Sequence, residues 1–307
     1  MKAMILAAGL GTRLRPITHT MPKPMVPLCN RPLIAWAIES LHAAGVRDLI
    51  VNLHHLPDQL ERYLRGAYDR IEFSYEKDIL GTGGAIRRVR PLLANEEAFF
   101  LVNGDTVQFP RWPALRDALG DNIAALTLRH PPANDRFTPV YFDGAHVTGF
   151  GDGIGEALMF AGSHLISTRV FEYFPDQEEF GVVDRVYQPL LASNRETIGG
   201  TVDDGLWFDV GTPQRYLGAS QGLVAAMARG ELTPPPGSFV DGDSLLHESA
   251  SGRAVSSTVG ARSTIRGEVR DSIVWDDCVI EGTIERCIVA HGVRVTGTHR
   301  DEVIVSS

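Results

Sequence analysis

Two patterns of apolar and polar positions alternate along the first hundred residues. Short apolar runs predict buried strands at 1–6, 49–51, 71–75 and 99–103. Apolar residues at helical spacing predict helices between them, at 32–44, 57–64 and 82–89. Strands that alternate with helices are typical of a largely parallel sheet covered by helices. We therefore expect an α/β fold for this part of the chain.

The alternation of predicted strands and helices becomes less regular in the second hundred residues. Apolar runs predict strands at 124–129, 140–142 and 158–166, without full helices between them. Parallel neighbours need such a crossover, so we expect a sheet that is mainly parallel but mixed in strand direction. A helix over 213–227 closes this domain, whose predicted limits are residues 1–230.

A proline-rich segment and then a repeat follow the predicted domain. Pro234–Gly237 cannot continue a helix and predicts a semi-rigid linker, here placed at 231–250. From 251 to 307 the chain repeats itself every fifteen residues. The columns in register are Gly267, Gly282 and Gly297; Val259, Val274 and Val289; Ile265, Ile280 and Val295; Val269 and Ile284; Ser257, Ser272 and Cys287. This period predicts a short β-solenoid, and irregular loop packing is the alternative. We expect its exposed edges to dock on the first domain or on a second copy of the chain.

Composition limits the class of protein. The 307 residues are 44% hydrophobic, and 29 basic against 38 acidic residues give a net charge of −9, which argues against a nucleic-acid-coating protein. The three cysteines form no C-x-x-C pair, so neither a disulfide framework nor a zinc site is indicated. No apolar segment has the length of a signal or membrane span. We expect a cytoplasmic protein with no membrane partner.

The segment Leu6–Pro16, with the sequence LAAGLGTRLRP, carries candidate phosphate-binding chemistry. Gly9 and Gly11 remove side chains directly after a strand, so backbone N–H groups can point at an anion. Arg13 adds a guanidinium, and Lys23 adds an ammonium held between Pro22 and Pro24. A nucleoside triphosphate is the predicted ligand, and a tight turn with solvated arginines is the alternative.

Two familiar glycine-rich loops do not fit this segment. The dinucleotide fingerprint needs a third glycine where this chain has Leu14, and the Walker loop needs Gly-Lys-Ser/Thr where it has Gly11-Thr12-Arg13. The loop is therefore of another kind.

Two aspartates follow apolar runs that predict strands. Asp105 follows Asn103-Gly104 at the end of the strand at 99–103, and Asp209 ends the run that starts at Leu206. Thr212 and Pro213 supply a cap and first turn for the next helix, so Asp209 is not needed as its cap. Magnesium takes one or two carboxylates together with substrate phosphate oxygens, and we predict Mg²⁺ on these two residues. Two ordinary turn aspartates are the alternative.

A third glycine-rich segment, Gly81-Thr82-Gly83-Gly84, lies between the strand at 71–75 and the next predicted helix. One prediction is that this segment contacts the base or the sugar of a bound nucleotide. The alternative is that it is only the start of a helix, capped by Thr82.

Taken together, these motifs resemble the sugar-1-phosphate nucleotidyltransferases, in particular mannose-1-phosphate guanylyltransferase-like and N-acetylmuramate-1-phosphate uridylyltransferase-like members. The resemblance covers most of the chain. It implies a Rossmann-like nucleotidyltransferase domain followed by a short left-handed β-helix, with Arg13, Lys23 and Asp105 as catalytic residues and Asp105 and Asp209 as metal ligands. The residues implied in nucleotide binding are Leu6, Ala7, Ala8, Gly9, Gly11, Thr12, Arg13, Lys23, Gly81, Thr82, Gly83, Asn103, Gly104 and Asp105.

The acceptor site departs from this family pattern. Where the family often carries Glu-Lys-Pro, the comparable segment here is Gly149-Phe150-Gly151-Asp152-Gly153. Gly162 and Asp184 are candidates for sugar binding, and Arg136 and Arg185 are candidate replacements for the missing lysine.

The resemblance implies transfer of a nucleotidyl group to a sugar 1-phosphate with release of pyrophosphate. GTP with mannose 1-phosphate or a related hexose or heptose 1-phosphate is the first hypothesis. UTP with N-acetylmuramate or glucose 1-phosphate is the alternative. A hypothesis from another class is a nucleotide-sugar-binding regulatory protein without turnover.

Overall fold

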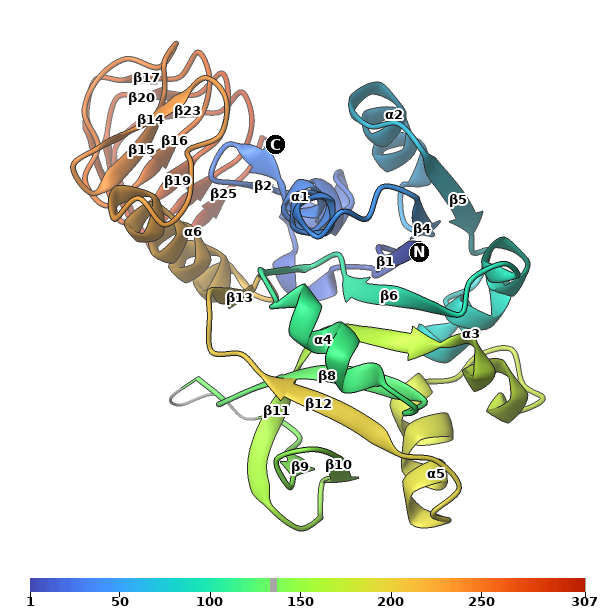
Figure 1. The fold of residues 1–307 in the computed structure, drawn as a ribbon. Coiled ribbons are helices and arrows are strands. Elements are labelled where there is room, and N and C mark those ends of the chain that lie inside the picture. Colours follow the sequence, from blue (N-terminus) through green and yellow to red (C-terminus); the bar gives the residue numbers. More distant parts are fainter. Residues whose placement is uncertain (133–136, 307) are drawn as a thin grey trace. The chain divides into compact units, whose positions relative to one another are not determined.

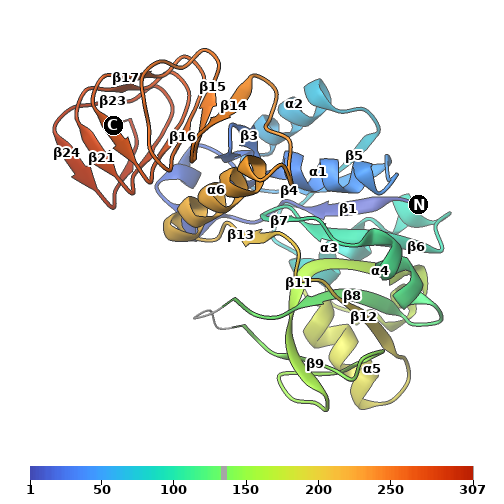
Figure 2. The same ribbon diagram turned by 60° about the vertical axis from the view of Figure 1, so that its left-hand side comes forward.

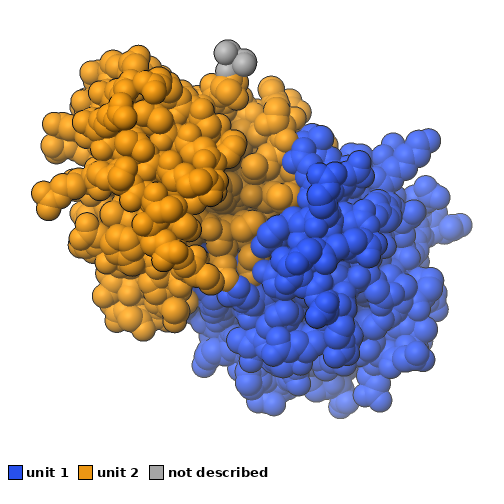
Figure 3. Space-filling model, turned by 90° about the horizontal axis from the view of Figure 1, so that it is seen from above, with its two compact units in different colours: residues 1–9, 36–207 blue, residues 10–35, 208–307 orange. Residues whose placement is uncertain are grey.

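The computed structural model describes residues 1–132 and 137–306, and these form two compact units (Figure 1, Figure 3). The first unit consists of residues 1–9 and 36–207, and the second of residues 10–35 and 208–307. The division passes through the predicted phosphate loop, between Gly9 and Leu10. The limits predicted above, 1–230, 231–250 and 251–307, follow the sequence pattern and stay a prediction.

One mixed sheet forms the centre of the first unit (Figure 1). Its strands, in spatial order, are β10 (Val147–Phe150), β9 (Val140–Phe142), β11 (Glu156–Ser167), β6 (Ala98–Asn103), β1 (Ala3–Leu6), β4 (Leu49–Leu53) and β5 (Ile71–Tyr75). Two more strands continue from β11, namely β8 (Ala124–Arg129) and β12 (Ile198–Val202). The strands from β6 to β5 are parallel, whereas β11 is antiparallel to β6, β8 and β9. The expected mixed sheet is confirmed.

Helices complete the first unit and enclose its apolar core. They are α2 (Pro57–Ala67), α3 (Gly81–Arg88), α4 (Trp112–Leu119) and α5 (Gln188–Ala192), while α1 (Leu33–Ala43) crosses the division between the units. The core is built from aromatic and branched residues such as Phe99, Leu101 and Leu126, all with 1% exposure or less. Because the parallel strands β1, β4 and β6 are buried along most of their length, their polar atoms can reach a ligand only at the strand ends.

The fifteen-residue repeat of the second unit forms three parallel sheets (Figure 2). The first contains β16 (Thr258–Val259), β19 (Ile273–Val274), β22 (Ile288–Val289) and β25 (Val303–Ile304). The second contains β17 (Thr264–Ile265), β20 (Val279–Ile280) and β23 (Arg294–Val295), and the third β18 (Glu268–Arg270), β21 (Thr283–Glu285) and β24 (Thr298–Arg300). Val259 pairs with Val274 and Val274 with Val289, as the repeat predicted. The β-helix expected for this region is confirmed.

The solenoid is extended by a hairpin within the range predicted as a linker. Strands β14 (Ser238–Asp241) and β15 (Ser244–His247) pair with each other, and β15 continues the first solenoid sheet by pairing with β16. Gly237 has a positive φ of 74° where this hairpin begins.

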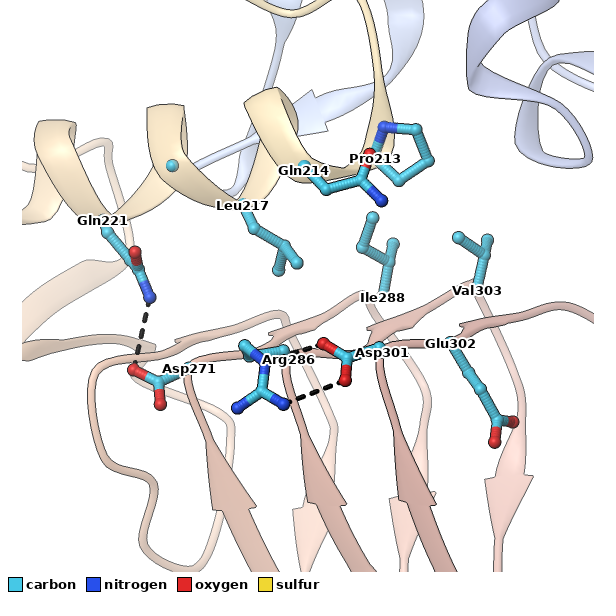
Figure 4. Close-up of a pocket in the computed structure, with 11 residues that line it drawn as sticks. Pro213, Gln214, Leu217, Gln221, Asp271, Arg286, Ile288, Asp301, Glu302 and Val303 are labelled. Atoms are coloured by element: carbon cyan, nitrogen blue, oxygen red, sulfur yellow. Dashed lines mark hydrogen bonds and ion pairs between the residues drawn. The ribbon is translucent and has the colours of Figure 1, made fainter. Parts of the chain in front are cut away.

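Helix α6 (Pro213–Ala228) packs along the solenoid within the second unit. The Ser220 and Thr258 hydroxyls lie 2.8 Å apart, and the Trp275 indole N–H donates to the Tyr216 hydroxyl at 3.0 Å. Between α6 and the last rungs a groove of about 220 Å³ remains, with Leu217 on one side and Ile288 on the other (Figure 4). Gln221 donates to Asp271 at 3.3 Å across this groove, so polar as well as apolar contacts join α6 to the solenoid.

Candidate active site

In the first unit, the predicted phosphate loop starts beside the predicted metal aspartate. Leu6 is in register with Asn103 across β1 and β6, and the Gly104 N–H donates to the Leu6 carbonyl oxygen at 2.9 Å. A Cβ on Gly104 would lie 2.8 Å from that oxygen, so only glycine lets the two strand ends approach so closely. The arrangement brings Leu6, where the predicted loop starts, next to Asn103 and Gly104. The nucleotide contacts of these residues and of Ala7, Ala8 and Gly9 stay predictions.

Asp105 follows the end of β6 after one intervening residue and lies directly before the short strand β7 (Thr106–Gln108). Its carboxylate is half-buried, and the Thr106 hydroxyl donates to it at 3.5 Å. Its place at the carboxyl end of a central strand is the expected one. Its role as a metal ligand stays a prediction.

Two buried polar residues that the sequence analysis did not select, Asn52 and Glu76, connect the phosphate loop to the glycine-rich segment. The Ala7 N–H donates to Asn52 Oδ1 at 2.6 Å, and Asn52 Nδ2 donates to Glu76 Oε1 at 2.7 Å. Glu76 Oε2 accepts from the Leu80 N–H at 3.2 Å. The signal in the sequence was one asparagine within the apolar strand β4.

The segment Gly81–Gly84 forms the first turn of α3 instead of an open loop. The N–H groups of Gly83 and Gly84 donate to the Phe180 carbonyl oxygen at 2.8 and 3.2 Å. A Cβ on Gly83 would clash with the Phe180 ring, so close packing already explains a glycine there. Thr82 is not the helix cap, because α3 begins at Gly81 and Leu80 occupies the N-cap position. The Thr82 hydroxyl instead accepts from the Val182 N–H at 3.0 Å. The nucleotide contacts of Gly81, Thr82 and Gly83 stay predictions.

The two residues predicted to bind sugar have different surroundings. Gly162 has a φ of 93°, and a Cβ there would lie 2.7 Å from the Asn103 side-chain nitrogen, which places Gly162 beside Asn103-Gly104-Asp105. Asp184 lies in the exposed first turn of the π-helix η6 (Val183–Tyr187), with Arg185 at 3.8 Å. Arg136 lies outside the described residues.

In the second unit, Gly11 shapes the rest of the phosphate loop. Its φ is 62°, and a Cβ there would lie 3.0 Å from side-chain atoms of both Lys23 and Thr18. Its carbonyl oxygen accepts from the Thr18 hydroxyl at 2.8 Å. The left-handed backbone and the crowding both require glycine at this position.

The two predicted cations differ in exposure. Lys23 is only 5% exposed and begins the 3-10 helix η3 (Lys23–Met25), after Pro22 with a φ of −65°. Arg13 lies in η1 (Thr12–Leu14) and is exposed. Lys23 is thus enclosed by protein and flanked by Pro22 and Pro24 in the sequence, while the side chain of Arg13 is exposed. The catalytic roles of both residues stay predictions.

Gly211 brings Arg13 near Asp209 within the second unit. A Cβ on Gly211 would lie 3.0 Å from Arg13 Nη2 and 3.1 Å from Asp209 Oδ1. Asp209 also pairs with Arg215, an arginine of the first turn of α6 that the sequence analysis did not identify. The Thr212 hydroxyl accepts from the Arg215 N–H at 3.3 Å and caps α6, as predicted, which leaves the Asp209 carboxylate for this ion pair.

The chemistry of the two aspartates fits magnesium better than a transition metal. Both offer carboxylate oxygens, which magnesium prefers. Within residues 1–132 and 137–306, no group of three or more histidine, cysteine, aspartate or glutamate side chains could enclose a metal. A cation on either aspartate would need further ligands, for example from substrate, as magnesium commonly does.

The same described ranges contain no helix that is both long and apolar enough to cross a membrane.

Comparisons with known proteins agree on one class of enzyme. The family described as "Nucleotidyl transferase" matches residues 2–125. A mannose-1-phosphate guanyltransferase of Hypocrea jecorina is 29% identical over 279 residues, covering 81% of this chain and 72% of the relative. The corresponding protein of Neurospora crassa is 30% identical over 269 residues, covering 80% of this chain and 71% of the relative.

A solved structure confirms the fold. HddC from Yersinia pseudotuberculosis, complexed with GMP-PN, superimposes with a TM-score of 0.61 at 23% identity, covering 72% of this chain and 99% of HddC. The fold and the matched family therefore define a nucleotidyl transferase. More particularly, the chain belongs to the sugar-1-phosphate nucleotidyltransferase family, since the similarity to the Neurospora crassa relative extends over most of both proteins.

Proposed function

We propose that this enzyme transfers GMP from GTP to mannose 1-phosphate, giving GDP-mannose and pyrophosphate. The observation that carries the proposal is the similarity, over about four fifths of the chain, to proteins named mannose-1-phosphate guanyltransferase. A zebrafish (Danio rerio) mannose-1-phosphate guanylyltransferase catalytic subunit beta adds support, with 45% identity over 116 residues. The acceptor segment without Glu-Lys-Pro leaves a related hexose or heptose 1-phosphate as the other guanylyl acceptor to test.

In the proposed reaction, a phosphate oxygen of the sugar phosphate attacks the α-phosphorus of the triphosphate in line. A new P–O bond forms while the bond from the α-phosphorus to the bridging oxygen breaks, and pyrophosphate takes the electron pair. The protein mainly positions the reactants and neutralises charge. We assign charge neutralisation to Arg13 and Lys23, since one is accessible and the other is held in place by Pro22 and Pro24.

We also propose that the enzyme depends on magnesium. Asp105 and Asp209 would hold the ion, which when bound supplies positive charge next to the phosphate oxygens. Arg215 would orient the Asp209 carboxylate for that purpose, because the two side chains form an ion pair. Pairing of two copies through the solenoid and a cytoplasmic location stay predictions.

A substrate matrix tests this proposal. Pyrophosphate release is measured with magnesium for each of the four nucleoside triphosphates against mannose, glucose, N-acetylmuramate and heptose 1-phosphates. We expect the highest rate for GTP with mannose 1-phosphate. Activity confined to UTP would show that the enzyme is a uridylyltransferase and not a guanylyltransferase. Nucleotide-sugar binding without turnover in any combination would indicate the regulatory protein instead.

A further inference from the structure

A pocket of about 240 Å³ lies within the second unit, between the segment 21–32 and the solenoid. The segment contributes Met21, Met25 and Asn30 to its lining, and the solenoid contributes Trp275 and Asp276. Among the described residues that line this pocket, none was assigned to the active site. Its side chains therefore need an explanation of their own.

The solenoid side of the pocket departs from the fifteen-residue repeat. Trp275 stands where the neighbouring turns have glycine and alanine, and Asp276 stands where they have alanine and histidine. The backbone pairing is regular all the same, since Val274 pairs in register with both Val259 and Val289. The solenoid turn thus requires neither the indole nor the carboxylate at these two positions.

The apolar walls of the pocket suit a flat aromatic ring. Met21 and Met25 offer polarisable thioethers, which make favourable contacts with aromatic rings. Trp275 is 7% exposed, and its indole N–H donates to the Tyr216 hydroxyl, which fixes the orientation of the ring. Sites for drug-sized ligands measure roughly 300–1,000 Å³, so this smaller pocket has room for one ring system and not for a whole nucleotide sugar.

Asn30 offers a hydrogen-bond acceptor to a ligand in this pocket. It lies in the turn between β2 (Pro27–Leu28) and β3 (Arg31–Pro32), and its side-chain nitrogen donates to the Ser238 hydroxyl and to the Val259 carbonyl oxygen, both at 3.1 Å. Both N–H groups of the amide are used in this way, so the side-chain oxygen is what Asn30 can present to a ligand.

Asp276 adds a negative charge and further acceptor positions. Its Oδ1 accepts from the Ala261 N–H at 2.8 Å, whereas a carboxylate can accept about four hydrogen bonds. Arg262 forms a bidentate pair with Asp277, and its Nη2 lies 3.9 Å from Asp276 Oδ2, which is beyond hydrogen-bond distance. The Asp276 carboxylate therefore favours a ligand that brings N–H donors.

We propose that this pocket binds a flat heteroaromatic ring with neighbouring N–H donors, and that guanine is the ring that fits it best. Guanine presents its N1–H and its 2-amino group on one edge, where a carboxylate accepts from both at once. Met21, Met25 and Trp275 would pack on the ring while Asp276 and Asn30 accept from its edge. The ribose and phosphates of a guanine nucleotide would stay outside the pocket.

The experiment counts the guanosine molecules bound per chain, by equilibrium dialysis, in the natural protein and three variants. Asp276→Asn keeps an oxygen for the Ala261 N–H but places an amide where the ring needs an acceptor. Met21→Trp fills the pocket without a change of charge. Glu268→Gln is the matched control, because it removes one negative charge from an exposed position of β18.

We expect Asp276→Asn and Met21→Trp to bind one guanosine fewer per chain than the natural protein and Glu268→Gln. Unfolding temperatures without guanosine check that the variants fold, and Met21→Trp decides alone if Asp276→Asn does not. The same number of bound molecules in all folded proteins would overturn the inference.

Inosine, which is guanosine without the 2-amino group, tests whether Asp276 accepts from the edge of the ring. Loss of one hydrogen bond to a charged group predicts binding that is about tenfold to hundredfold weaker at this pocket. Equal affinity for guanosine and inosine at the site that Asp276→Asn removes would overturn the assignment of guanine.

The count also separates this inference from the proposed function. A base-binding position in the active site would hold guanosine equally in all four proteins, because none of the substitutions is at an active-site residue. The proposed function thus changes the total number of bound molecules, whereas the pocket changes the difference between the proteins.

Discussion

At the scale of single residues, we expect a substitution of Arg13 to affect catalysis but not folding. Its side chain is exposed, and its guanidinium lies against Gly211 near the Asp209 carboxylate. Loss of one preorganised positive group costs about 10² to 10³ in turnover, by analogy with the loss of an oxyanion-hole donor. We therefore expect Arg13→Ala to lower kcat by that factor while the urea midpoint of unfolding stays unchanged.

The matched control for this prediction is Arg253→Ala, at an exposed arginine of the solenoid. It removes the same charge far along the chain from the phosphate loop and should leave kcat unchanged. Equal turnover in Arg13→Ala, Arg253→Ala and the natural enzyme would refute the role of Arg13.

A second residue-scale prediction concerns His164, buried in β11. Burial lowers the pKa of His164 from 6.5 to about 3, and Nδ1 of its ring lies 3.1 Å from the Tyr187 hydroxyl, whose pKa burial raises. The unfolded chain takes up a proton at this site below about pH 6.5, whereas the folded chain does not. Stability therefore falls as the pH drops from about 6.5 towards 3.

This coupling gives a measurable difference between two proteins. From pH 6 to pH 4, His164 should remove about 2 kcal/mol of the free energy of unfolding, at about 1.4 kcal/mol per pH unit over most of that range. The variant His164→Asn has no titrating group at this position. Its free energy of unfolding, measured with urea, should therefore fall by about 2 kcal/mol less than that of the natural protein over the same pH interval. Identical pH dependence in both proteins would show that His164 is not buried in its neutral form.

The residues that the sequence predicted and those that it missed differ in how local their signal is. Arg13, Lys23, Asp105 and Asp209 stand within a few residues of glycines or prolines that mark their loops. Asn52 depends on Ala7, which is 45 residues away, and on Glu76, which is 24 residues away. No local pattern contains such pairings, so only the register of the sheet reveals them.

At the scale of elements, two glycines of α6 give opposite predictions. A methyl group on Gly218 would meet nothing within 4 Å, whereas one on Gly222 would clash with the Phe208 ring. Alanine is favoured over glycine in a helix by up to about 1 kcal/mol, so Gly218→Ala should raise the free energy of unfolding by roughly that amount. Gly222→Ala should lower it by about 1–3 kcal/mol through overpacking, as measured by urea unfolding.

Activity provides the second measurement on this pair. Phe208 directly precedes Asp209, so its displacement in Gly222→Ala should also lower kcat, while Gly218→Ala should keep the natural value. Equal effects of the two substitutions on both stability and kcat would contradict the packing of Phe208 on α6.

Element prediction succeeded where the apolar period was clear and failed where packing overrides it. The runs that predict β8 and β9 match the observed strands residue for residue, and α1 and α6 begin and end within one residue of their predicted limits. Strand β12, with the sequence IGGTV, was missed because two glycines interrupt its apolar pattern. A Cβ on Gly199 would clash with the Ala118 carbonyl oxygen, so the glycine is there to let α4 approach the strand.

At the scale of the whole molecule, the repeat was the most informative long-range signal. A fixed period sets the register of every rung, so pairings such as Ile265 with Ile280 followed from the sequence. The order of strands in the mixed sheet did not, because β11 pairs with β6, β8 and β9 through contacts without a period. Family membership is confirmed by the comparisons, while the substrates remain a proposal to be tested.

The most direct test of the account is pyrophosphate release from GTP and mannose 1-phosphate with magnesium, compared between the natural enzyme and Asp105→Asn. We predict that the natural enzyme forms one GDP-mannose for each pyrophosphate released. Asp105→Asn should fold normally and lose turnover by a factor of about 10² or more, as expected when charge stabilisation at the phosphates is removed. Equal rates in the two proteins, or no GDP-mannose from the natural enzyme, would contradict the account.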